Sequence, residues 1–187
     1  MPKIKVKRKF PCSDRFDGKE VTLDVMTRNH ADSLAKFAAT LSRDDLMFLR
    51  LDIRDEETRQ QWFKNIESGH TLTILALDAS ENMVGYCSLH VNSRTWTSHI
   101  GEFRVLVAPG FRGTGLSTRL INEIFQIARE LKLERLVVHI AREQRRFRGL
   151  LEEMGFQAEA LLTDWLKSRD GNTHDLVIMS QHLGDQN

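Results

Sequence analysis

The residues best suited to chemistry lie in the segment VLVAPGFRGTGLSTRLI, from Val105 to Ile121. It is typical of a strand that ends near Pro109, a glycine-rich turn, and a helix that begins directly after the turn. Such a turn presents backbone N–H groups at the positive end of a helix, an arrangement that binds phosphate or pyrophosphate. Gly113 and Gly115 allow a ligand to approach the backbone closely. An ordinary tight turn would carry the same glycines, but Arg112 and the following helix favour a phosphate site.

Two common nucleotide motifs do not fit this segment. Gly110 and Gly115 have the spacing of a P-loop, but Leu116 stands where that motif requires lysine. A dinucleotide fingerprint needs a third glycine after Gly113 and Gly115, and Thr118 stands there. It also needs a βαβ unit, whereas the strands before this segment are predicted to form an antiparallel meander. The segment therefore indicates a phosphate site of another kind.

The same residues resemble the core motif of the GNAT superfamily of N-acetyltransferases. That motif is a strand with V-x-P, followed by R/Q-x-x-G-x-G/A at the start of a helix. Val107-Ala108-Pro109 matches the first part, and RGTGLS from Arg112 matches the second, with Ser117 in place of the usual glycine or alanine. The predicted order of elements also resembles that fold along nearly the whole chain.

The resemblance implies that acetyl-CoA is bound as the acyl donor. No metal is expected, because the sequence has no pattern of paired Cys and His residues. Backbone amides would hold the pyrophosphate of acetyl-CoA, and they belong to Arg112, Gly113, Thr114, Gly115, Leu116 and Ser117. The pantetheine arm would lie along the strand edge formed by Val105, Leu106 and Val107. It would occupy a V-shaped gap whose other side is the next strand, 136–140.

Acetyl transfer to an amine needs a base, because an alkylamine with a pKa of about 10.4 is mostly protonated near neutral pH. Glu102 is the first candidate, since it lies on the donor strand, where some family members place a catalytic glutamate. A salt bridge to Arg104 is the alternative role. His139, in the apolar strand RLVVHI, is the second candidate, because histidine titrates in the useful range. A hydrogen-bonded core histidine is its alternative. A backbone N–H near Leu106 or Val107 is the expected oxyanion donor.

The predicted helix 143–154 departs from the family pattern at two positions. The family usually carries an asparagine early in this helix, and a tyrosine four residues before the glycine that ends it. Gln144 and Leu151 stand at these positions. Gln144 can still hydrogen-bond the pantetheine, but Leu151 cannot protonate the leaving thiol. Tyr86 is the only tyrosine in the chain.

Two functions therefore stay open at this stage. The first is an N-acetyltransferase that moves acetyl from acetyl-CoA to a primary amine by direct attack in a ternary complex. The second is an acyl-CoA-binding sensor or interaction module without turnover, which the missing tyrosine favours. The acceptor, the acyl chain length and the general acid are not determined by the residue pattern.

Hydrophobic periodicity predicts the elements that position these residues. Strands are predicted at 3–7, 20–26, 71–78, 83–91, 98–107, 135–140, from 156 onward, and from 172 or 173 to 181. Helices are predicted at 29–41, 56–66, 114–131 and 143–154. We therefore expect one α/β (α+β) domain over residues 1–187, with a mixed, mostly antiparallel sheet of about seven strands flanked by helices. The resemblance adds a V-shaped splay between the fourth and fifth core strands.

Several apolar residues fall where this fold forms its acceptor side. They are Met47, Phe48, Leu49, Trp62 and Phe63. They are either core residues, which is the default, or the wall of a substrate pocket. Trp165 is expected near the acceptor channel, and Asp164 beside it would attract a cationic amine.

Composition narrows the remaining classes of partner. The 187 residues carry a formal net charge of +1, which provides no general attraction to nucleic acid or an anionic membrane. No stretch approaches the roughly 20 apolar residues of a membrane span, and the basic N-terminus lacks the apolar part of a signal peptide. Two cysteines are too few for a disulfide scaffold. We expect a cytoplasmic protein whose partner is a small-molecule or protein amine, with a homodimer left open.

Overall fold

The computed structural model describes residues 4, 7–42, 45, 49, 52–92, 94–168 and 170–184. Its strands are β1 (Cys12–Phe16), β2 (Lys19–Val25), β3 (Thr71–Asp78), β4 (Met83–Val91), β5 (Ile100–Val107), β6 (Arg135–Ala141), β7 (Gln157–Lys167) and β8 (Thr173–His182). Its helices are α1 (Ala31–Thr40), α3 (Glu56–Glu67), α4 (Leu116–Glu130) and α5 (Arg145–Glu153). Short 3-10 turns occupy Arg28–His30 and Pro109–Phe111.

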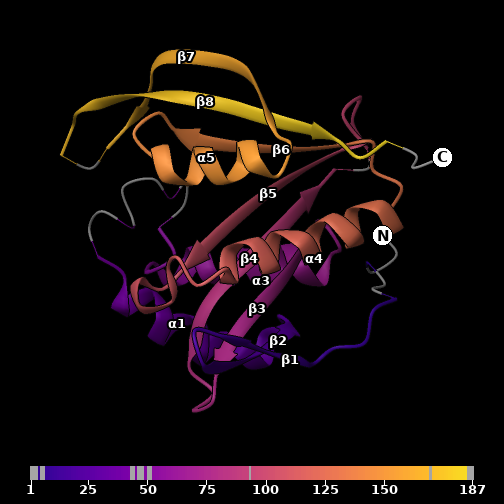
Figure 1. Ribbon diagram of the computed structural model, residues 1–187, viewed down its shortest axis with the longest axis vertical. Helices are drawn as coiled ribbons and strands as arrows, with labels where there is room; N and C mark the ends of the chain where they lie inside the picture. Colours follow the sequence, from indigo (N-terminus) through magenta and orange to yellow (C-terminus); the bar gives the residue numbers. More distant parts are fainter. Residues whose placement is uncertain are drawn as a thin grey trace.

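The strands form one sheet in the order β1-β2-β3-β4-β5-β6-β8-β7 (Figure 1). Every neighbouring pair is antiparallel except β5 and β6, which are parallel. This confirms the predicted mixed, mostly antiparallel sheet. The described residues contain eight strands instead of about seven. The predicted strand at 3–7 lies largely outside the described residues.

The strand that sequence reasoning missed is β1. It forms a hairpin with β2 through Asp17 and Gly18, whose φ angles of 49° and 74° suit a two-residue hairpin turn. In β1 only Phe16 is buried, while the three residues before it are exposed. An edge strand with so few buried side chains carries little hydrophobic alternation, so the periodicity did not reveal it.

Helices cover both faces of the sheet, and each face has its own core. On one face, α4 packs over β3, β4 and β5, and its Leu120 and Ile124 join Phe103 in the larger core. On the other face, α1 and α3 pack over β3 and β4, where Phe37 and Trp62 surround Tyr86. Because successive residues of a strand point to opposite faces, the central strands β3 and β4 contribute side chains to both cores.

The parallel pair β5 and β6 separates soon after it begins. Pairing is limited to Ile100, Gly101 and Glu102, which lie opposite Arg135, Leu136 and Val137. Beyond Glu102, β5 stays paired with β4 as far as Val107, while β6 stays paired with β8 as far as Ala141. The two strands therefore diverge as a V with its apex near Glu102 (Figure 1), which confirms the predicted splay.

A glycine marks the apex of this V. A Cβ atom on Gly101 would lie 2.7 Å from Leu89 Cδ1 and 2.8 Å from Leu133 Cδ1. Because Gly101 has no side chain, Leu89 and Leu133 can pack directly against the backbone where β5 and β6 are still paired.

Candidate functional site

The turn between β5 and α4 has open space beside its two glycines. Gly113 and Gly115 have φ angles of 77° and 92°, and a Cβ on either would meet no atom within 4 Å. The first bond of α4 onto this turn runs from the Arg119 amide to the Gly115 carbonyl, at 3.0 Å. The amides of Leu116, Ser117 and Thr118 precede that bond and therefore have no acceptor within the helix. The turn thus has the form that an anion site requires.

Arg112 has a different role from that of a direct phosphate ligand. Its Nε donates to the Val107 carbonyl at 3.2 Å, and its Nη2 pairs with Asp45. The side chain therefore links the glycine turn back to the end of β5. The guanidinium is thus engaged within the protein, and the proposed phosphate ligands are the amides of the turn.

The edge of β5 that is predicted to bind the acyl donor, Val105 to Val107, forms one wall of the V. Val105 and Leu106 are half-buried and Val107 is buried. On the other wall, the Gln144 side chain accepts a hydrogen bond from the Ala141 amide at 2.9 Å and so caps the end of β6. Gln144 thus lies beside the opening of the V, while its role toward pantetheine stays a prediction.

The structure brings the two predicted base candidates together at the apex. Glu102 Oε1 accepts from Arg104 Nη2 at 2.7 Å and from Arg104 Nε at 3.2 Å. His139 approaches from β6, with its Nδ1 3.9 Å from the same carboxylate oxygen. The side chains of Glu102 and His139 are 24% and 35% exposed, so both are within reach of a ligand. Glu102 therefore forms the salt bridge to Arg104 that was its alternative role, and it is also accessible to a ligand.

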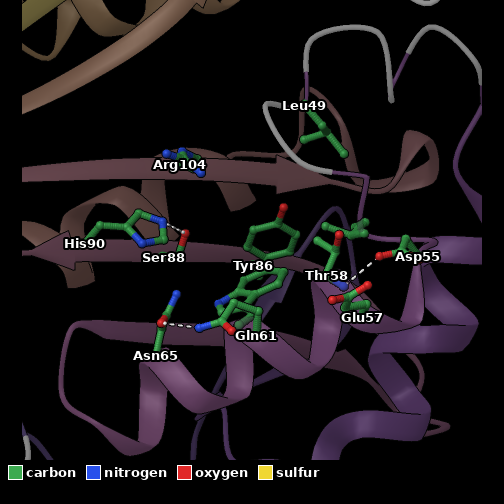
Figure 2. Close-up of a pocket in the computed structure, with 12 residues that line it drawn as sticks. Leu49, Asp55, Glu57, Thr58, Gln61, Asn65, Tyr86, Ser88, His90 and Arg104 are labelled. Carbon is green, nitrogen blue, oxygen red and sulfur yellow. Dashed lines mark hydrogen bonds between the residues drawn. The ribbon is translucent and has the colours of Figure 1, made fainter.

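An open pocket of about 340 Å³ reaches this region from the face covered by α3 (Figure 2). Its wall is formed by Leu49, Ile53, Asp55, Glu57, Thr58, Gln61, Trp62, Asn65, Tyr86, Ser88, His90 and Arg104. Arg104 lines the pocket and also holds Glu102, so the pocket adjoins the apex of the V. Two carboxylates of the pocket, Asp55 and Glu57, stand at the start of α3, where Asp55 also caps the helix by accepting from the Thr58 amide at 2.7 Å.

Sequence reasoning missed His90, which lines this pocket. His90 lies opposite Glu102 in the β4–β5 register, on the same face of the sheet. Its Nδ1 is 3.0 Å from Thr71 Oγ1, and its Nε2 is 3.0 Å from Ser88 Oγ. The available signal was the spacing of Tyr86, Ser88 and His90, which places three polar side chains on one face of an otherwise apolar strand.

Not every residue predicted near the acceptor lies at the pocket. Trp62 is buried and lines it, and its Nε1 donates to Thr73 Oγ1 at 3.2 Å, whereas Phe63 belongs to the core. Met47 and Phe48 lie outside the described residues. Trp165 and Asp164 lie on the outer strand β7 and do not line this pocket, so their role toward the acceptor stays a prediction. Trp165 is 66% exposed there.

Leu151, at the position of the usual tyrosine, is fully buried in the larger core. It contributes packing alone at the end of α5.

No helix in the described ranges has the length and apolar character that crossing a membrane requires. Within those ranges, no group of three or more His, Cys, Asp or Glu side chains is arranged to hold a metal ion.

The sheet splays between β5 and β6, β5 leads into a glycine-rich helix start, and a pocket opens beside Arg104 on the face covered by α3. Residues 37–156 match the sequence model of the acetyltransferase (GNAT) family. The chain therefore belongs to the GNAT family of acetyltransferases.

Relatives support this assignment. The chain is 27% identical over 111 residues to a spermidine N(1)-acetyltransferase of Vibrio cholerae, a match that covers 58% of this chain and 62% of that enzyme. A crystal structure of spermidine N-acetyltransferase from Vibrio cholerae with CoA and spermine aligns with a TM-score of 0.73 at 22% identity, covering 87% of this chain and 95% of that one. A phosphinothricin acetyltransferase from Sinorhizobium meliloti in complex with acetyl-CoA aligns with a TM-score of 0.73 at 19% identity, covering 88% and 89%. At these identities the two solved structures establish a shared fold.

Proposed function

We propose that this chain transfers an acetyl group from acetyl-CoA to a primary amine by direct attack in a ternary complex. The observation that carries the proposal is the V between β5 and β6, which opens beyond Glu102, with the glycine turn and its surrounding open space at the end of β5. The pyrophosphate binds at residues 112–117, and pantetheine lies along Val105–Val107. Family membership supports this arrangement, as do related folds solved with CoA and with acetyl-CoA.

In this proposal the apex of the V is the reaction centre. Glu102 takes the proton of the attacking amine, while Arg104 hydrogen-bonds its carboxylate and His139 lies beside it. A backbone N–H near Leu106 or Val107 stabilises the oxyanion. The amine enters from the pocket that Arg104 lines, so donor and acceptor approach β5 from different sides.

Direct attack is favoured over a covalent acetyl-cysteine. Cys87 is fully buried on the α4 face, and burial raises the pKa of its thiol well above the usual value. A thiol of this kind is a poor nucleophile near neutral pH. Cys12 lies on β1 at the outer edge of the sheet, four strands away from β5.

The acceptor that we propose is a small amine. Asp55 and Glu57 at the pocket rim suit a cationic ligand, and a relative acetylates spermidine according to its name. We also propose that residues 1–187 act as one acyltransferase domain in the cytoplasm, without a metal, nucleic acid or membrane partner. If the chain forms a homodimer, the outer strand β7 is the proposed contact, since Leu161 and Trp165 are exposed on it.

A second candidate function is an acyl-CoA sensor without turnover, which the buried Leu151 favours. Release of CoA thiol from acetyl-CoA distinguishes the two, measured with spermidine, spermine and a panel of amino acids and aminoglycosides. Amine-dependent thiol release supports the enzyme. Thermal stabilisation by acetyl-CoA, but not by ATP or NAD, with no thiol release from any amine supports the sensor. Failure of acetyl-CoA to bind would contradict both.

A further inference from the structure

Tyr86 is a polar side chain of the pocket to which the proposed reaction gives no role. It lies in the middle of β4, directly opposite Leu106 on the donor strand β5. Cross-strand partners project to the same face, so Tyr86 shares the face of Arg104 and Leu106. Figure 2 shows its hydroxyl pointing toward the strand that carries Arg104.

The ring of Tyr86 is held firmly in place. Trp62 packs edge-on at 4.9 Å between ring centroids, and Phe37 does so at 6.2 Å. Only 4% of the residue is exposed. Among the described residues, the hydroxyl has no hydrogen-bond partner. Tyr86 lines the pocket, and a hydroxyl that points toward β5 from the pocket wall is suited to hydrogen-bond a ligand.

The surroundings keep this hydroxyl protonated. Burial raises the pKa of Tyr86 well above its usual range, while the nearby positive charge of Arg104 acts in the opposite direction. A neutral phenol is available as a hydrogen-bond donor throughout the physiological range. Such a group stabilises a developing oxyanion without giving up its proton, which a backbone N–H also does.

We propose that the Tyr86 hydroxyl donates a hydrogen bond to the carbonyl oxygen of the bound acetyl group and so acts as a side-chain oxyanion donor beside the backbone of β5. Neighbouring strands lie about 4.8 Å apart, so a tyrosine hydroxyl that points toward β5 extends in the direction of the V on the far side of that strand. This inference rests on the proposed function, because it requires acetyl-CoA in that gap.

The step that Tyr86 assists is balanced as follows. The amine lone pair forms the C–N bond while the carbonyl π electrons move to oxygen, where the phenol O–H stabilises the charge. The oxyanion then re-forms C=O and the C–S bond breaks, with its electron pair leaving on sulfur. The amine proton passes to Glu102 and, through solvent, to the thiolate. Tyr86 keeps its proton throughout.

The carbonyl stretch of acetyl-CoA labelled with ¹³C at the carbonyl tests this contact without an acceptor. A hydrogen bond to the carbonyl lowers its stretching frequency, so the bound donor should absorb at lower frequency in the wild type than in Tyr86→Phe. Phenylalanine keeps the ring and its packing. Phe37→Leu, which disturbs the packing but keeps the hydroxyl, should retain the lower frequency. An identical band in wild type and Tyr86→Phe overturns the proposal.

Kinetics and ¹⁹F NMR provide independent readouts. With the best amine from the screen above, Tyr86→Phe should lower kcat about 100-fold, as loss of one oxyanion donor does, and leave KM for acetyl-CoA nearly unchanged. Because Tyr86 is the only tyrosine, 3-fluorotyrosine labels this site alone. Its ¹⁹F resonance should move more with acetyl-CoA than with CoA, and equal shifts would overturn the proposal. Wild-type protein that binds no acetyl-CoA would instead refute the proposed function itself.

Discussion

Glu102 and His139 face each other across the apex of the V, with His139 Nδ1 3.9 Å from Glu102 Oε1. They come from the two strands that part at this point, β5 and β6. Arg104 holds the same oxygen from within β5 at 2.7 Å. This carboxylate accepts hydrogen bonds from Arg104, lies beside His139 at the meeting point of the V and the pocket, and is the group that the proposed mechanism uses as its base.

Replacing Glu102 by glutamine should therefore lower the rate of acetyl transfer while sparing donor binding. Glutamine keeps the shape of the side chain but cannot accept the amine proton, so kcat should fall about 10²–10⁴-fold. The Kd for acetyl-CoA, measured by calorimetry, should change little. His139→Gln is the companion variant, and we expect it to lower kcat less. A Glu102→Gln enzyme with wild-type kcat would remove Glu102 from the mechanism.

A methyl group at Gly115 should weaken binding of acetyl-CoA. Its Cβ would project into the open space beside the turn, where the pyrophosphate is expected, and the φ of 92° is unfavourable for alanine. Gly110→Ala is a matched control in the same loop, since its Cβ also meets no atom and its φ needs no glycine. Calorimetry should give a clearly raised Kd for Gly115→Ala and a wild-type Kd for Gly110→Ala. Equal affinities in both variants would argue against the amide site.

Gly101 should be important for stability at the apex of the V. In Gly101→Ala the new methyl would collide with Leu89 and Leu133, and overpacking of this kind costs about 1–3 kcal/mol of the free energy of unfolding. Urea denaturation of the variant beside Gly184→Ala, where a Cβ meets nothing within 4 Å, measures the difference. Matching midpoints for the two variants would show that the core adjusts without cost.

The raised pKa of Tyr86 predicts a loss of stability in alkali. The folded state holds the phenol proton more tightly than the unfolded chain, whose tyrosine pKa is about 10. The contribution of the Tyr86 hydroxyl to the free energy of unfolding is therefore fully present below about pH 10. It is lost as the pH rises through the pKa of the folded state. The Tm of the wild type should fall relative to that of Tyr86→Phe above about pH 10. Parallel curves of Tm against pH for the two proteins between pH 8 and 11 would contradict a raised pKa of Tyr86.

Much of the fold follows from local pattern. The strand, turn and helix around Val105 to Ile121 were predicted because glycine placement and helical periodicity act over a few residues. The hairpin of β3 and β4 was predicted with its observed bounds for the same reason. β1 was not, because a mostly exposed edge strand has no apolar alternation to detect.

The residues that line the pocket could be identified only from the tertiary structure. His90 and Tyr86 were visible in the sequence, but their importance depends on the β4–β5 register that sets them opposite Glu102 and Leu106. The place of Trp165 in the sheet also needed the tertiary structure. Its strand follows α5 in the chain, yet β8 inserts between it and β6 and moves it to the edge of the sheet.

By itself, the sequence determined the order of elements, the amide-rich turn before Leu116 and the resemblance to a family, because each of these depends on neighbouring residues. Only the tertiary structure decided that Glu102, His139 and Arg104 meet at the apex of the V, and that Tyr86 points at the donor strand. These relationships depend on strand register and on where two paired strands separate, and both are set by packing between segments far apart in the chain.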